Sequence, residues 1–283
     1  MVPPGDIGAL PLWVGVYLAL AVSMTVSGYA FYHRVVRLIR QGKPAASFDH
    51  PLHRLTGAFI IVLGQRKVLQ RVPAGDWAGI GHATIFWGFL TLLFSYGIFI
   101  FAASAWRHLP EKLFTETGVR VYATYLDILA VVLLVMLSWA LIRRWAVKPR
   151  RLSFDLTRNS DALITVGLIA GLMITALLTH SFYVAEGGTG PEADVIIGGL
   201  LGNWFTDLGL GEGAASTLQA VFWWSHLALI LGFSMYIPFS KHMHMFAAPA
   251  NAFFRSLEPR GTLPTIDLEN TERFGAGRVQ DFT

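Results

Sequence analysis

The sequence predicts an all-α integral membrane protein, a bundle of five transmembrane helices, and three observations carry that prediction. Hydrophobic residues fill 54% of the 283 positions and charged residues 14%, whereas an average soluble domain is about 25% charged. The mean hydropathy is +0.51. The apolar residues gather in five runs, each of about 20 residues, the length that a helix needs to cross the hydrocarbon core of a bilayer. This composition excludes a soluble globular fold.

The five transmembrane helices are expected at about 11–32, 78–104, 121–142, 161–182 and 217–239. Only helices and closed barrels satisfy their backbone groups in lipid, and runs this long and continuous are not barrel strands. Two further segments, 52–71 and 246–257, combine apolar residues with basic ones, as helices on a membrane surface do. We therefore expect five spanning helices and two surface helices.

The basic residues indicate how the bundle is oriented. Segments 33–77, 143–160 and 240–283 hold eight, six and five Lys or Arg residues. The other side has three, and its connection 183–216 has five acids and no Lys or Arg. Because basic loops face the cytoplasm, the amino terminus is expected outside and the carboxyl terminus inside, in the inner (cytoplasmic) membrane. The net charge of +4 then reflects topology, and no nucleic-acid partner is expected.

Histidines are the main candidates for chemistry, because the chain has no cysteine. That absence excludes disulfides, thiolate zinc sites and iron–sulfur clusters held by these residues. Five of the nine histidines lie in or beside loops and are interpreted as solvated: His33, His50, His53, His108 and His242. The other four are assigned to helices, with His244 at the cytoplasmic end of the fifth, and an ionisable residue there is by default a functional candidate: His82, His180, His226 and His244.

The spacing of these four histidines suggests two levels in the membrane. His226 and His244 are 18 residues apart, which in one helix is five whole turns, about 27 Å along the same face. His82 is expected at the level of His244, and His180 at the level of His226. Imidazole pairs from facing helices suit haem b. They suit equally the proton relay of a haem-free, proton-coupled transporter, and spacing alone leaves both open.

Two stretches resemble a known family, GHATIFWGFLTLL (81–93) and SHLALILGFSMYIPFSKHMH (225–244). They resemble the gamma subunit of respiratory nitrate reductase, whose fifth helix carries two haem histidines with a Pro-Phe-Ser-basic run before the second. The closer resemblance is to the cytochrome b module fused to iron–sulfur reductases of the heterodisulfide reductase type. Its marks here are GHATIFWG, WWSH, PFSKHMH and APANAFFR, and the likeness covers most of the chain from about residue 55 onward.

The resemblance implies haem ligands at particular positions. His82 and His244 are implied as ligands of a cytoplasmic haem b, and His226 as one ligand of an outer haem b. The nitrate reductase pattern has a second histidine ten residues beyond His82, where this chain has Leu92. We assign His180 as the partner of His226, because it is the remaining helical histidine at that level. The chain is therefore expected to bind one or two haems.

A quinone, menaquinone or ubiquinone, is the expected membrane substrate. By analogy with the family, its site is expected at the outer face near the outer haem, bounded by helices two to four. Asp127 lies inside the outer end of the third predicted helix. It would relay protons from a quinol there; an aspartate paired with amides or reaching for the interface is the alternative.

The predicted function is electron transfer between that quinone and a cytoplasmic iron–sulfur oxidoreductase domain or subunit rich in cysteine. Residues 1–245 are expected to form a transmembrane cytochrome b domain, and residues 246–283 a cytoplasmic tail or linker toward the iron–sulfur domain. The stretch FGAGRVQDFT (274–283) resembles the lead into such a domain in the fused reductases. The alternative function is the haem-free transporter with a histidine relay.

Overall fold

The computed structural model describes residues 3–5, 11–41, 49–70, 72–75, 77–148 and 156–257. Every regular element in these ranges is helical. Five helices are long and apolar enough to cross a membrane, which confirms an all-α architecture with five candidate spans: Leu12–Ile39, Ala78–Ala105, Leu109–Val147, Ser160–Ala185 and Glu212–Phe239. Residues 258–283 of the predicted tail lie outside the described residues.

Several spans consist of more than one helical type. The first and second spans each join three helical pieces. The third span ends in a π-helical turn and the fifth in a 3₁₀ turn, whereas the fourth is one α-helix. In chain order they are α1 (Leu12–Phe31), η1 (Tyr32–Val36) and α2 (Arg37–Ile39); α5 (Ala78–Ser95), η3 (Tyr96–Ala102) and α6 (Ala103–Ala105); α7 (Leu109–Ile142) and η4 (Arg143–Val147); α8 (Leu156–Ala185); α10 (Glu212–Tyr236) and η5 (Ile237–Phe239).

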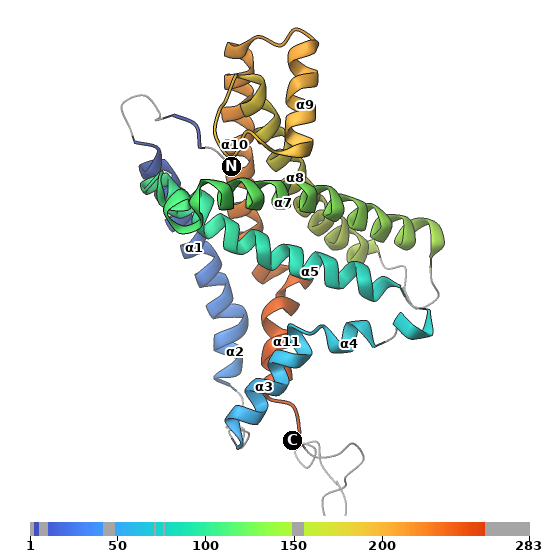
Figure 1. Cartoon of the computed structure of the whole chain (residues 1–283). Helices are drawn as coiled ribbons and strands as arrows, with labels where there is room; N and C mark the ends of the chain where they lie inside the picture. The colour runs from blue at the N-terminus through green and yellow to red at the C-terminus, as the bar shows by residue number, and fades with distance from the viewer. Residues whose placement is uncertain are drawn as a thin grey trace, which may run out of the picture.

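The core lies where α8 packs against both α7 and α10. Leu133 of α7 and Met173 of α8 are almost completely buried in it, with Phe233 of α10. α5 approaches α7 closely because Gly88 has no side chain: a Cβ there would lie 2.8 Å from a methyl carbon of Leu133. In Figure 1, α5 and α7 run side by side. Small residues thus allow the close helix contacts that membrane bundles favour.

The connection between α8 and α10 contains a helix that sequence analysis did not predict, α9 (Ile196–Asp207). α9 packs on the end of α8, and the two helices and the start of α10 form one end of the molecule (Figure 1). Gly202 permits this contact, because a Cβ there would lie 2.6 Å from the carbonyl oxygen of Ser181. With 12 residues, α9 is too short to be recognised by a search for spans.

Both segments predicted as surface helices are helical. The first contains α3 (Pro51–Val62) and α4 (Arg66–Leu69), and the second contains α11 (His244–Phe253), which packs against α3. Arg54 of α3 is buried. It donates to the carboxylate of Asp49 at 2.7 Å and to the carbonyl oxygens of Phe253 and Arg255 at the end of α11. This arginine therefore ties the two surface helices together.

The fifth helix ends at Phe239, as its predicted range 217–239 has it, so the interpretation of the spacing from His226 to His244 as five turns of one helix is wrong. α10 ends at Tyr236, residues Ile237–Phe239 form a 3₁₀ turn, and Ser240 is extended with φ −111° and ψ 169°. A second 3₁₀ turn, η6 (Lys241–Met243), precedes α11. Pro238 has no N–H for a helical hydrogen bond, and the Ser240 hydroxyl accepts the N–H of His242 at 3.1 Å. The turn, and not a five-turn helical repeat, therefore sets the position of His244.

Candidate functional sites

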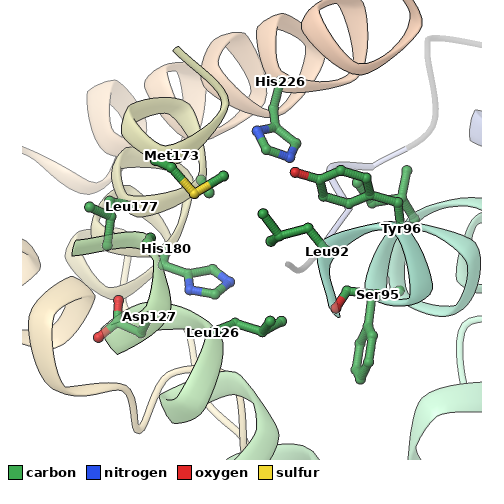
Figure 2. A pocket seen from close by; sticks show the side chains of 13 residues that line it. Leu92, Ser95, Tyr96, Leu126, Asp127, Met173, Leu177, His180 and His226 are labelled. Atoms are coloured by element: carbon green, nitrogen blue, oxygen red, sulfur yellow. The ribbon is translucent and has the colours of Figure 1, made fainter. Parts of the chain in front are cut away.

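The five predicted site residues fall into two places. His180, His226 and Asp127 line one pocket between α5, α7, α8 and α10, which we call the His226 pocket. Its other lining residues are mostly apolar: Leu92, Ser95, Tyr96, Phe99, Ile100, Leu126, Ala130, Met173, Ala176 and Leu177 (Figure 2). His82 and His244 lie together near the end of α10, with His242 beside them. We call these three the His244 cluster.

His226 is fully buried, and its ring is held by Thr175. The Nδ1 atom lies 2.8 Å from the Thr175 hydroxyl oxygen, and that hydroxyl donates its hydrogen to the carbonyl oxygen of Gly171 at 2.7 Å. Since a hydroxyl has one hydrogen, Thr175 accepts the hydrogen of His226 Nδ1–H. The Nε2 atom then carries a free lone pair, and it is buried without a hydrogen-bond partner.

His180 projects into the same pocket from α8. It is 5% exposed, and its Nε2 atom is also buried without a partner. α9 backs this histidine, because a Cβ at Gly198 would lie 2.9 Å from the Cβ of His180. Figure 2 shows the imidazoles of His180 and His226 entering the pocket from different walls. The structure therefore brings together the two histidines that sequence analysis paired on depth alone.

Asp127 is 2% exposed and is paired with amides. Its carboxylate accepts the backbone N–H groups of Ile197 and Gly198, the latter at 3.1 Å. These groups belong to the first turn of α9, where N–H groups have no helical partner and a negative charge is favoured by the helix dipole. Asp127 thus fixes α9 to α7 while it lines the pocket.

Tyr96 is a pocket residue that sequence analysis missed. Its hydroxyl is buried without a partner, and its ring meets the His226 ring edge-on with centroids 5.3 Å apart. Leu92, one turn earlier on the same face, fills the position where the nitrate reductase pattern has histidine. Because Tyr96 follows Leu92 by four residues, the two share a helix face, and this spacing in the sequence would have identified Tyr96 as a neighbour of that position.

His82 and His244 face each other in the second place. Their ring centroids are 6.1 Å apart, with an angle of 54° between the planes, and both residues are exposed. His244 Nδ1 lies 3.0 Å from the carbonyl oxygen of Lys241. Because a carbonyl oxygen only accepts, Nδ1 carries the hydrogen and Nε2 has the lone pair, as in His226.

His242 is the second residue that sequence analysis missed, since it was interpreted as solvated. The ring is half-buried between Phe89 and Phe233, with centroids 5.9 and 5.0 Å away. It also lies 5.4 Å from the ring of His244. Burial lowers the pKa of His242 to about 4, and repulsion from His244 acts in the same direction. His242 is therefore neutral near pH 7.

The two places offer imidazoles in pairs. Within the described ranges, no group of three or more His, Cys, Asp or Glu residues is arranged to hold a metal ion. A prosthetic group that brings its own equatorial ligands needs only two more from the protein. Of these imidazoles, those of His180 and His226 have a buried Nε2 atom without a hydrogen-bond partner.

Comparisons with known proteins give two relatives. The chain is 32% identical over 269 residues to the probable iron-sulfur-binding oxidoreductase FadF of Bacillus subtilis, covering 92% of this chain and 36% of that protein. It is 27% identical over 293 residues to the EtfAB:quinone oxidoreductase of Syntrophomonas wolfei, covering 99% of this chain and 39% of that protein. No protein-family model and no solved structure matches the chain. Nearly the whole chain is therefore similar to a segment that makes up little more than a third of each of these two oxidoreductases.

Proposed function

We propose that the chain is a membrane cytochrome b that transfers electrons between a membrane quinone and a cysteine-rich iron–sulfur domain or subunit. The observation that carries the proposal is the presence of two imidazole pairs, each with a histidine whose Nδ1–H is held by a hydrogen bond. The relatives support both partners, since one is described as iron-sulfur-binding and the other as a quinone oxidoreductase.

His82 and His244 would hold one haem b. A bond from a metal to an imidazole nitrogen is about 2 Å long, and the ring centroids of His82 and His244, 6.1 Å apart, are close enough for both rings to reach one ion. The Nδ1 bond of His244 to a backbone carbonyl is the kind of outer contact that orients metal-binding histidines. When bound, the haem would supply one-electron redox chemistry.

His226 and His180 are proposed as the ligands of a second haem b, in the His226 pocket. Leaving a buried polar atom without a partner costs about 1–3 kcal/mol, and both Nε2 atoms are in that state. Ligation of a metal ion would give each of these nitrogens a partner. His180 would then take the ligand role that Leu92 cannot perform.

We infer the membrane orientation from the distribution of basic residues. The His244 cluster would then lie on the cytoplasmic side and the His226 pocket nearer the outer face of the inner (cytoplasmic) membrane. Residues 1–245 would form the cytochrome domain, and residues 246–283 would lead toward the iron–sulfur partner. The His244 cluster would thus be the place at which the iron–sulfur partner exchanges electrons with this chain.

The quinone site is proposed beside the His226 pocket, bounded by α5, α7 and α8. Oxidation of a quinol releases protons as well as electrons, so a nearby group must accept them. Asp127 is the proposed acceptor, because its carboxylate lines the pocket. The two amides of α9 hold that carboxylate in place.

Haem content tests the proposal. The protein purified from membranes is expected to show a low-spin haem b spectrum on reduction, and His82→Ala or His244→Ala should each remove one haem. His108→Ala is the control, because that side chain is exposed and pairs with Glu111. Absence of haem from the unaltered protein, or normal low-spin content in both variants, would overturn the proposal. Proton-coupled solute uptake without haem would favour the transporter.

A further inference from the structure

A carboxylate on α8 holds the turn that carries His244. Asp161 accepts the hydroxyl hydrogen of Tyr236 on one oxygen and the backbone N–H of Lys241, at 3.2 Å, on the other. Tyr236 is the last residue of α10, and Lys241 is the first residue of η6. One side chain therefore bridges both ends of the segment in which the chain leaves the helix.

The same segment orients the imidazole of His244. The carbonyl oxygen of Lys241 accepts the Nδ1–H of His244, so Asp161 holds the very residue that holds the histidine. Within the turn, the Ser240 hydroxyl donates to the carbonyl oxygen of Ile237 at 3.1 Å and accepts from His242 N–H. These local bonds shape the turn, and Asp161 fixes it to α8.

We propose that Asp161 is a positioning residue for His244, which keeps its ring facing His82 and places a negative charge beside the His244 cluster. The inference rests on the proposed function, in which this pair binds a haem. Carboxylates that support a metal-binding histidine usually contact the ring directly; here Lys241 stands between them. The negative charge stabilises the more positive, oxidised state of any redox group held there.

Variants of Asp161 separate positioning from general stability. Asp161→Asn removes the charge but keeps one acceptor oxygen, whereas Tyr236→Phe removes one hydrogen bond and keeps the charge. Asp161→Ala removes both. Ser23→Ala is the matched control: its hydroxyl ties α1 to the carbonyl oxygen of Leu231 in α10 at 3.0 Å, away from the turn.

The experiment is a redox titration of the purified protein, followed by optical and electron paramagnetic resonance spectra. In Asp161→Asn the midpoint potential of the haem at His82 and His244 should become more positive, and Asp161→Glu should restore it. Tyr236→Phe should alter the low-spin signal with little change in potential. Asp161→Ala should weaken haem retention there by about 10- to 100-fold. Ser23→Ala and the second haem should be unaffected.

Two outcomes would overturn the inference and leave the proposed function intact. One is an unchanged potential and spectrum in Asp161→Asn and Asp161→Ala; the other is an equal loss of both haems, which would make Asp161 a residue of general stability. If Asp161→Ala does not accumulate, Asp161→Asn and Tyr236→Phe decide. Absence of haem from the unaltered protein would overturn both the function and this inference.

Discussion

The His226 pocket and the His244 cluster hold their histidines by different means. In the pocket, His180 and His226 are enclosed by four helices, and neither is more than 5% exposed. In the cluster, His82 and His244 are exposed, and His244 follows a broken helix. Packing therefore fixes the pocket, whereas a hydrogen-bonded turn fixes the cluster. The cluster should therefore tolerate changes in the core, whereas the pocket should respond to them.

The largest expected effect is loss of a haem from one region only. His226→Ala removes an imidazole from the pocket, so the haem proposed there should disappear while the haem proposed at His82 and His244 remains. In His82→Ala the haem proposed at His82 and His244 should disappear, and the haem proposed in the pocket should remain. Haem content per chain and the low-spin signals of the two variants measure this independence. Loss of both haems in either variant would contradict the separation of the two regions.

Thr175→Val tests the orientation of the pocket histidine. Valine keeps the volume but leaves Nδ1–H of His226 without its acceptor, so binding in the pocket should weaken by about 10- to 100-fold. Thr179→Val is the matched control, because Thr179 is one turn further along α8, is also buried, and donates its hydroxyl hydrogen to the carbonyl oxygen of Thr175. Equal haem loss in the two variants would argue against a specific role for Thr175.

Asp127→Asn separates the two roles of that residue. Asparagine keeps an oxygen that accepts an amide of α9, so the fold and haem content should be retained. It has no carboxylate to take up a proton, so quinol-dependent reduction of the haems should slow. Stopped-flow reduction with a quinol measures the rate. An unchanged rate would leave Asp127 with its structural role alone.

The smallest expected effect is on stability, from the contact between α9 and His180. Gly198→Ala introduces a Cβ 2.9 Å from the Cβ of His180, and such overpacking costs about 1–3 kcal/mol. Gly199→Ala, where a Cβ meets nothing within 4 Å, is the control. Thermal unfolding in detergent should show a lower midpoint for Gly198→Ala only, with a disturbed pocket haem and a normal cluster. Identical midpoints would mean that α9 shifts enough to accommodate the added methyl group without a loss of stability.

The sequence alone determined the membrane class and the five spans, because crossing a bilayer requires only local properties, length and apolarity. It also selected His82, His226 and His244, through motifs in two short stretches, as candidate haem ligands that remain predictions. The helix boundaries were less accurate. α9 was missed because it is short, and α10 stops at Tyr236 because a proline and a serine cap compete with the helical pattern.

The tertiary structure decided which residues meet. His180 and His226, 46 positions apart, line one pocket; Asp127 bonds to Ile197 of α9 and Asp161 to Lys241 of the turn, which are 70 and 80 positions away. Tyr96 and His242 became candidates only when their surroundings were known. Such contacts depend on which helix faces pack together and on the direction of each side chain. A helix period fixes neither, because packing is a property of the whole bundle and periodicity a property of one segment.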